Sequence, residues 1–333
     1  MIISRPDVPQ AEAPLLEVRD LKMHYPGSRT LFGRAARVVQ AVDGVSFSLA
    51  RGETLALVGE SGCGKTTTGK SVLRLIQPTA GSVKFDGEEI LGLPRERMRE
   101  HRRDMQIIFQ DPYASLNPRM TAGEIVGEPL RNFPAAGARA RQEELAWLFS
   151  RVGLRPEAMK KFPHEFSGGQ RQRLGIARAL ALRPRLIVCD EPVSALDVSV
   201  QAQVINLLMD LQQEMGIAYL FVAHDLAVVR HISHRVAVMY LGRIVEIADR
   251  DTLFSRPLHP YTEILLSAVP VPDPHRPAQR KLLAGDPPSP ANPPSGCRFH
   301  PRCPLAQPVC REQQPTLMQR AQGISQWVAC HFR

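Results

Sequence analysis

A glycine-rich stretch between a buried strand and a helix constrains the fold of this chain more than any other feature. Residues 54–58 form an apolar run typical of a buried strand, and residues 65–76 carry apolar side chains at helical spacing. The glycines between them let backbone N–H groups curl around an anion, and the helix N-terminus adds partial positive charge. Strand, turn, Lys-Thr and helix together are typical of a phosphate-binding P-loop. The residues of this stretch that we expect to bind the phosphates of a nucleotide are Gly59, Ser61, Gly62, Cys63, Gly64, Lys65, Thr66 and Thr67.

Other stretches add candidate catalytic and binding residues. Residues 185–190 predict a buried strand whose polar end carries Asp190 and Glu191. These two acids point to opposite sides because side chains alternate along a strand, so one can serve a metal ion while the other faces a water. Residues 166–170 place a serine and two glycines before a helix, which is typical of an N-cap with exposed N–H donors. An ordinary cap is the alternative interpretation of that stretch.

Composition and charge indicate the cellular compartment of the protein and the classes of partner that it binds. The first residues have no apolar core of a signal peptide, and no run of eighteen apolar residues is present, so we expect a cytoplasmic protein that meets a membrane through a partner. A net charge of +9 is of the kind seen in proteins that bind nucleic acids. Residues 276–333, however, hold eight basic and two acidic side chains, so most of the excess lies in the tail. Solvated charged faces explain the remainder, and we expect no nucleic-acid partner.

Taken together, these stretches resemble the ATPase subunit of an ATP-binding-cassette (ABC) transporter. The resemblance covers about residues 15 to 265, and the joint occurrence of the motifs makes accident negligible. Phe166 stands where leucine is usual in the signature, and we expect little consequence because both side chains are apolar. The stretches that match in order and spacing are the P-loop, Gln110, residues 166–170, 186–191 and 194–197, and His224.

The resemblance implies a role for each matched residue. Tyr25 is similar to the aromatic residue that stacks on adenine, although an isolated tyrosine more often serves packing. Gln110 matches the glutamine that senses Mg²⁺ and the attacking water. Glu191 matches the general base, and His224 matches the histidine that contacts the γ-phosphate. Mg²⁺ is expected on Thr66, Gln110 and Asp190.

The resemblance further implies that ATP sites form between two subunits. The signature would act in trans, on ATP held by the P-loop of the opposite subunit, and Asp197 matches the D-loop aspartate. One chain thus supplies half of each of two sites, which implies a dimer closed by ATP. The signature residues are Ser167, Gly168, Gly169 and Gln170.

Three short motifs resemble the dipeptide and oligopeptide branch of bacterial importers: residues 115–119, 259–262 and 296–304. The resemblance implies an ATPase that couples hydrolysis of ATP to ADP and phosphate to transport, on the cytoplasmic face of the inner membrane. Its partners would be a second, different ABC ATPase subunit, two transmembrane permease subunits and an extracytoplasmic solute-binding protein. Related branches import nickel or glutathione, so those solutes stay open.

Two other classes of protein fit less well. A soluble ABC ATPase of DNA repair is disfavoured because no long coiled-coil insertion separates the P-loop from the signature, and one of translation because a single cassette is present. A binding module without hydrolysis is disfavoured because every catalytic position is filled.

The expected fold class is α/β: a P-loop NTPase of the ABC nucleotide-binding type, with an antiparallel β subdomain, an α-helical subdomain and a small cysteine-rich C-terminal extension. Nine prolines between residues 270 and 294 predict a linker that runs extended over the surface. The expected division is an ATPase core (residues 1–113 and 176–255), a helical signature subdomain (114–175), a proline-rich linker (256–295) and a cysteine-rich segment (296–333).

The six cysteines fall into two groups. Cys63 in the P-loop and Cys189 in a core strand are best explained as small structural residues, and the other four lie in the last 37 residues. Disulfides are not expected in a cytoplasmic protein, and a short segment set apart by prolines would gain from a metal. The spacing lacks the C-x₂-C pairs usual for zinc, and the tail resembles family members with a [4Fe–4S] cluster. The expected ligands are Cys297, Cys303, Cys310 and Cys330, with Zn²⁺ or unligated thiols as alternatives and a structural or partner-binding role away from ATP.

Overall fold

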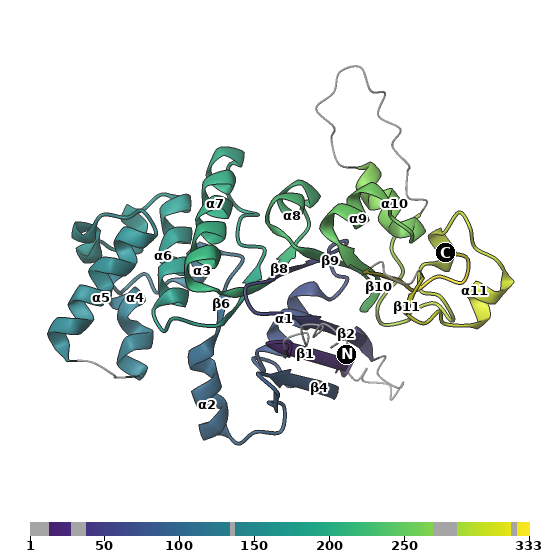
Figure 1. The fold of residues 1–333 in the computed structure, drawn as a ribbon, viewed down its shortest axis with the longest axis horizontal. Helices are drawn as coiled ribbons and strands as arrows, with labels where there is room; N and C mark the ends of the chain where they lie inside the picture. Colours follow the sequence, from purple (N-terminus) through teal and green to yellow (C-terminus); the bar gives the residue numbers. More distant parts are fainter. Residues whose placement is uncertain (1–12, 28–37, 134–136, 269–284, 321–324) are drawn as a thin grey trace, which may run out of the picture.

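Two β-sheets and several groups of helices make up the chain in its computed structural model (Figure 1). The structure describes residues 13–27, 38–133, 137–268, 285–320 and 325–333. The strands are β1 Leu16–Tyr25, β2 Val39–Leu49, β3 Thr54–Val58, β4 Ala80–Phe85, β5 Glu88–Glu89, β6 Met105–Ile108, β7 Leu186–Asp190, β8 Ala218–Ala223, β9 Arg235–Tyr240, β10 Arg243–Asp249, β11 Met318–Gln319 and β12 Gln326–Val328. The α-helices are α1 Lys65–Val72, α2 Arg95–Asp104, α3 Pro112–Ser115, α4 Ala122–Asn132, α5 Ala138–Arg151, α6 Gly168–Leu180, α7 Val198–Met215, α8 Leu226–Ile232, α9 Arg250–Ser255, α10 Pro260–Ser267 and α11 Pro308–Glu312. The 3₁₀ turns are η1 Pro156–Lys160, η2 Pro163–Glu165 and η3 His300–Arg302.

The larger sheet positions the candidate site. Its eight strands run in the order β11-β12-β10-β9-β3-β8-β7-β6. From β9 to β6 neighbouring strands pair in parallel, whereas β10, β12 and β11 add antiparallel pairs at the other edge. Every residue of β3, β7 and β8 is buried. This burial is why those strands are continuous apolar runs in the sequence, since parallel sheets are covered on both faces.

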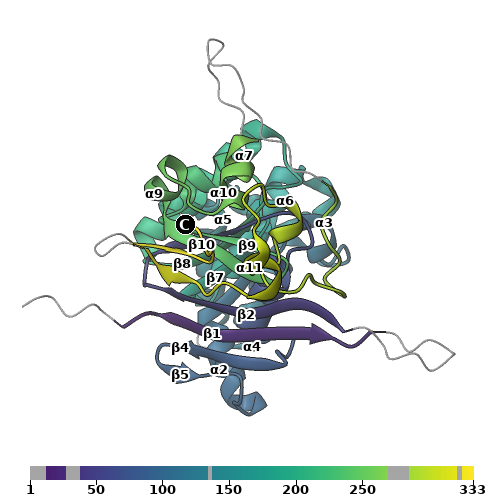
Figure 2. The same cartoon turned by 90° about the vertical axis from the view of Figure 1, so that its right-hand side faces the viewer.

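The smaller sheet packs its apolar face toward the larger one. Its order is β2-β1-β4-β5, and all its pairs are antiparallel. Side chains such as Leu16, Val18 and Val83 share one core with Leu55 and Val188 of the larger sheet. Figure 2 shows β1, β2 and β4 as a layer below the strands of the larger sheet. The antiparallel β subdomain expected from the family resemblance is present.

Helices α4, α5 and α6 gather at one end of the long axis in Figure 1, at the opposite end from α11. A capping box between Thr121 and Glu124 begins α4, and a second one between Ser167 and Gln170 begins α6. The helical subdomain expected over residues 114–175 contains α4, α5, the start of α6 and the 3₁₀ turns η1 and η2. Helix α2 was not expected from the sequence. Met98 is its one buried residue, so α2 has almost no apolar periodicity to detect.

Two expectations about the C-terminal third need correction. The stretch 256–295 is not all linker, because α10 lies within it and its Tyr261 is fully buried. Pro260 stands at the first turn of α10, where its missing N–H costs nothing. Residues 296–333 are not a separate appendage, because β12 pairs with β10 and so extends the larger sheet. The prolines expected to run extended lie partly in 269–284, outside the described residues.

Within the residues that the structure describes, no helix combines the length and apolar character needed to cross a membrane.

Candidate nucleotide-binding site

Four strands of the larger sheet deliver the candidate residues to one edge. The P-loop follows β3, Gln110 follows β6, Glu191 follows β7 and His224 follows β8. Because these strands are parallel neighbours, their carboxyl ends meet at the same edge, where ligands bind in open α/β sheets. The residues that line the resulting pocket of about 450 Å³ are Ala41, Ser61, Gly62, Gly64, Lys65, Thr66, Thr67, Gln110, Glu191 and His224.

The backbone of the P-loop requires glycine at two positions. Gly59 and Gly64 have φ angles of 151° and 105°, in the region that L side chains rarely adopt. A Cβ on Gly64 would lie 2.1 Å from the carbonyl oxygen of Ala41, and one on Gly59 would lie 2.1 Å from that of Met239. The loop is therefore pressed between β2 and β9. Ala41 is a lining residue that the sequence motifs did not indicate.

Lys65 is held inside the curl of the loop. Its buried Nζ donates to the carbonyl oxygens of Gly59, at 2.8 Å, and Glu60, at 3.1 Å. Helix α1 begins at Lys65, so its free N–H groups and its partial positive charge face the same pocket. A buried ammonium and a helix N-terminus together favour an anion such as a phosphate.

Thr66 and Asp190 join the P-loop to β7. The hydroxyl of Thr66 donates to Oδ1 of Asp190 at 2.6 Å. Burial raises the pKa of Asp190, while the Thr66 hydrogen bond and the positive charge of Lys70 oppose that rise. Thr66 lines the pocket and Asp190 is buried directly behind it; their hydroxyl and carboxylate are hard oxygen donors of the kind that Mg²⁺ prefers, so the residues fit that ion.

Glu191 is the centre of a second group of polar side chains. Gln110 donates through Nε2 to Oε2 of Glu191 at 2.9 Å, and Nδ1 of His224 lies 3.2 Å from the same oxygen. Glu191 has a φ of 47°, a left-handed conformation that is costly for a side chain of this size. Its backbone N–H donates to the carbonyl of Val222 and holds the turn against β8. The strain aims the carboxylate at the pocket while Asp190 stays buried beside α1.

Several residues predicted for the site lie outside this pocket. Among the residues that the structure describes, neither Tyr25 nor any member of 167–170 lines it. Tyr25 is 37% exposed at the end of β1, and Asp197 is exposed at the start of α7. Within the P-loop, Gly59 and Cys63 are buried behind the lining, and burial raises the pKa of the Cys63 thiol.

The signature stretch begins α6 on the helical side of the molecule. Ser167 is its N-cap and accepts a hydrogen bond from the N–H of Gln170 at 3.3 Å. Gly169 lies against α7, since a Cβ there would be 2.5 Å from Cγ1 of Val200. Val198, the first residue of α7, is 81% exposed. Val198 and the adjoining Asp197 are thus both exposed where α7 begins.

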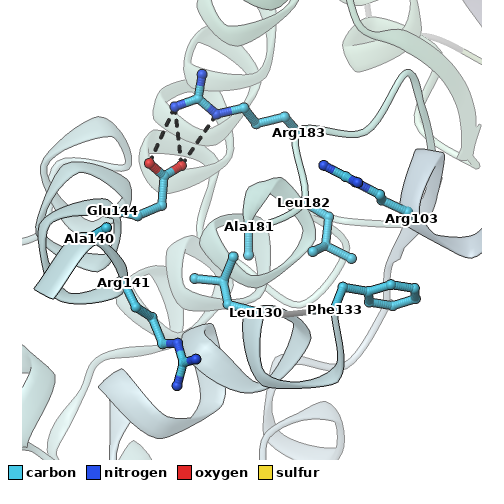
Figure 3. Close-up of a pocket in the computed structure, with 9 residues that line it drawn as sticks. All are labelled: Arg103, Leu130, Phe133, Ala140, Arg141, Glu144, Ala181, Leu182 and Arg183. Carbon is cyan, nitrogen blue, oxygen red and sulfur yellow. Dashed lines mark hydrogen bonds and ion pairs between the residues drawn. The ribbon is translucent and has the colours of Figure 1, made fainter. Parts of the chain in front are cut away.

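A second pocket lies between the helical subdomain and the end of α2 (Figure 3). It has a volume of about 270 Å³, and Leu130, Phe133 and Leu182 provide apolar walls. An ion pair between Arg183 and Glu144 lies at its edge, and Figure 3 shows Arg103 on the opposite side of the opening. The other lining residues are Ala140, Arg141 and Ala181.

The four tail cysteines gather in one region but do not form a metal site as they stand. Burial raises the pKa of Cys297 to about 11, and the thiols of Cys310, Cys303 and Cys330 contribute to the rise. In the part of the chain that the structure describes, no group of three or more His, Cys, Asp or Glu is placed to hold a metal ion. The expected [4Fe–4S] cluster is therefore not supported.

The tail also reaches the P-loop, which corrects the expectation that it lies away from ATP. Arg302, directly before Cys303, donates to the carboxylate of Glu60 at 2.8 Å. Glu60 and Arg302 were not singled out by sequence motifs, because a contact 242 residues apart in the chain leaves no local signal.

Models of two protein families match the chain. The model described as "ABC transporter" matches residues 42–194, and the one described as "Oligopeptide/dipeptide transporter, C-terminal region" matches residues 245–310. A probable peptide ABC transporter ATP-binding protein of Sinorhizobium fredii is 58% identical over 96% of this chain and 90% of its own length. The oligopeptide transport ATP-binding protein AppF of Bacillus subtilis is 54% identical over 96% of this chain and 97% of its own length.

A solved structure of a dimeric ATP-binding cassette, in a post-hydrolysis state with ADP and Pi, resembles the fold with a TM-score of 0.63. It is 28% identical and covers 71% of this chain and 98% of its own.

Proposed function

We infer that this chain, which belongs to the dipeptide and oligopeptide importer branch of the ABC transporter ATPases, hydrolyses ATP to drive the uptake of peptides through a membrane permease. The observation that carries this inference is the meeting of Glu191, Gln110 and His224 at the mouth of the P-loop pocket. Relatives named for peptide transport match nearly the whole chain, which supports peptides over nickel or glutathione as the solute.

In this proposal the P-loop binds the phosphates and Glu191 activates water. Lys65 exchanges its contacts with backbone carbonyls for the β- and γ-phosphates, and the N–H groups at the start of α1 complete the cradle. Glu191 accepts a proton from water as the general base. Gln110 and His224 orient that carboxylate, and His224 is close enough to the pocket to contact a γ-phosphate. Tyr25, at the exposed end of β1, is proposed to stack on adenine.

Mg²⁺ is the proposed metal partner of ATP. Thr66 and Asp190 offer a hydroxyl and a carboxylate, and the Gln110 side chain adds an amide at the same edge. When bound, the ion neutralises charge on the phosphates. The chain's own contribution is to hold these oxygens in place through α1 and β7.

We propose that two ATPase subunits complete each other's sites. The signature stretch does not line the pocket of its own chain, and it packs against residues 196–200, where Asp197 and Val198 are exposed. A second subunit that covers this surface would bring Ser167 and its neighbours to the nucleotide on the opposite P-loop. In line with the branch, we propose that this second subunit is a different chain.

The pocket between α2 and the helical subdomain is the proposed docking site for the permease. Its apolar walls suit a short amphipathic segment, and Arg103 and Arg141 would pair with acids on it. The location also fits coupling, because β6 joins α2 to Gln110 at the nucleotide. Through this contact the chain would lie at the cytoplasmic face of the inner membrane, and an extracytoplasmic binding protein would deliver the solute.

The functional division along the chain remains our proposal. Residues 1–113 and 176–255 form the ATPase unit, residues 114–175 transmit its state, and the tail beyond 296 carries a four-thiolate centre. A [4Fe–4S] cluster on the four cysteines, or Zn²⁺ as the alternative, would require a local rearrangement that brings the thiols together. Anaerobic purification followed by iron, sulfide and zinc analysis tests it. About four iron and four sulfide per chain support the cluster, whereas stoichiometric zinc without sulfide supports the alternative.

The deciding experiment for the proposed function replaces Glu191 with glutamine in the assembled transporter. The substitution keeps the shape and removes the base, so hydrolysis should fall by about 10²–10⁴ while ATP still binds. Lys65→Ala is the matched contrast, because it removes a charge from the phosphates and should weaken ATP binding itself. ATPase rates and nucleotide-binding constants for both variants separate the two roles. Near-normal hydrolysis by a complex with Glu191→Gln in every competent site would contradict the assignment.

A further inference from the structure

Two motifs that set this chain within its branch, residues 259–262 and 296–304, meet at Glu60 of the P-loop. Arg302 donates to both carboxylate oxygens of Glu60, at 2.8 and 3.2 Å. The Tyr261 hydroxyl accepts a hydrogen bond from the backbone N–H of Glu60 at 2.9 Å. One P-loop residue is thus held at its side chain by the tail and at its backbone by α10.

The contact between Arg302 and Glu60 is shielded from water. The side chain of Arg302 is 6% exposed and that of Glu60 is 26% exposed. A guanidinium fork that grips both oxygens of a carboxylate fixes its orientation as well as neutralising its charge.

Aromatic packing connects the two contacts. The ring centroids of Tyr240 and Tyr261 are 4.7 Å apart, and that of Phe299 lies 5.2 Å from Tyr240 and 5.3 Å from Tyr261. Phe299 lies between Cys297 and Cys303 in the sequence, and all three rings are buried. A displacement of residues 297–303 would therefore also move Arg302 and disturb the packing around Tyr261.

The negative charge of Glu60 explains why its pairing with Arg302 matters for nucleotide binding. Its backbone oxygen already accepts from Nζ of Lys65 at 3.1 Å, so the residue is a direct neighbour of the phosphate-binding lysine. Glu60 does not itself line the pocket, but an unpaired negative charge on this neighbouring residue would repel the phosphates. Pairing with Arg302 offsets that repulsion.

The geometry points to Arg302 and Tyr261 as positioning residues that keep Glu60 from opposing ATP, so that the C-terminal cysteine segment sets the affinity of the P-loop. This inference rests on the proposed function in that it takes ATP as the ligand. Neither residue touches the reacting atoms, so the affinity should change and the chemical step should not.

The test compares Arg302→Gln, Glu60→Gln and the double variant in the assembled transporter. Arg302→Gln removes the charged partner of the Glu60 carboxylate. The KM for ATP should therefore rise about tenfold, equal to about 1.4 kcal/mol, while kcat stays within about twofold of the wild-type value. The double variant removes the stranded charge as well and should return the KM to within about threefold of the wild-type value. Arg311→Gln is the matched control, since Arg311 also adjoins a tail cysteine but is exposed, and its KM should not change.

A purely structural role would give a different pattern. Lower thermal stability with an unchanged KM in Arg302→Gln would overturn the inference, and so would a double variant as impaired as the single one. If Arg302→Gln does not fold, Tyr261→Phe removes one hydroxyl and should raise the KM about threefold at constant kcat; an unchanged KM there also overturns it. Failure of the wild-type complex to hydrolyse ATP would instead refute the proposed function.

Discussion

Asp43 is the charge on which the attachment of the tail to the ATPase core depends. This carboxylate on β2 accepts from Arg243 of β10 at 2.6 Å and from Arg298 of the tail, and His24 of β1 lies 3.1 Å away. The side chains of Asp43 and Arg298 are 10% and 7% exposed. Asp43→Asn keeps the shape and leaves two arginines facing each other across a neutral amide.

The burial of this group sets the magnitude. Removing one partner of a buried ion pair costs about 3–5 kcal/mol because the other charge stays desolvated. Asp86 is the matched control, since it also bridges two arginines, Arg51 and Arg185, but is 43% exposed. Exposed pairs contribute about 0–1 kcal/mol. For 333 residues the entropy of unfolding is roughly 0.7 kcal/mol/K, so Asp43→Asn should lower the Tm by about 4–7 °C and Asp86→Asn by less than about 1.5 °C.

Scanning calorimetry of the full chain at several pH values is the assay. Burial opposes ionisation of Asp43, but Arg243 and Arg298 outweigh it and hold its pKa below the usual value of 3.8. A depressed pKa means that the stabilisation is complete above about pH 4 and is lost as the pH falls through the folded-state pKa. The wild type and Asp43→Asn should therefore differ at pH 7 and converge only as the pH falls through the folded-state pKa, which lies below 3.8. Equal small shifts for Asp43→Asn and Asp86→Asn at pH 7 would refute the reasoning.

Three further predictions address the signature, a buried histidine and the docking pocket. Gly169→Ala places a Cβ 2.5 Å from Cγ1 of Val200, so α6 must shift away from α7. The ATPase activity of the assembled complex should then fall at least tenfold. Retained activity would show that α7 moves to accept the added methyl group and would contradict the prediction. Burial lowers the pKa of His259 to about 3, so at pH 5 the unfolded state takes up a proton that the folded state does not, and the free energy of unfolding should fall by about 2 kcal/mol between pH 7 and pH 5. His259→Asn keeps an acceptor for the Tyr261 N–H and should not show this fall. Parallel stability profiles of the two proteins from pH 7 to 5 would contradict this. Leu182→Asp in the pocket of Figure 3 should lower peptide uptake and co-purification of the permease without changing ATP binding by the chain, and full uptake would exclude this pocket as the docking site.

Local sequence determined the features whose physics is local. The P-loop is recognisable because a backbone that surrounds phosphate needs glycine at fixed positions, and Gly59 and Gly64 do have the expected left-handed φ. Strands β3, β7 and β8 were predictable because parallel strands covered on both faces are apolar throughout. Helix α7 was predictable as well, because its apolar period is regular and Gly216 ends it in a left-handed conformation.

Tertiary structure decided what depends on distant partners. Helix α10 begins at Pro260 inside a proline-rich stretch, because burial of Tyr261 against Tyr240 and Phe299 stabilises it. Strand β12 has three residues and exists because β10 offers a free edge. Short elements have little propensity of their own, so pairing and burial determine whether they form.

The same division applies to the candidate site. The residue types at the ends of β3, β6, β7 and β8 are readable in sequence, because each follows an apolar run. Their convergence, and the hydrogen bonds of Gln110 and His224 to one oxygen of Glu191, depend on strand order. The grip of Arg302 on Glu60 has no sequence signature, since an ion pair between residues 242 positions apart arises only when the chain folds the tail back onto the P-loop.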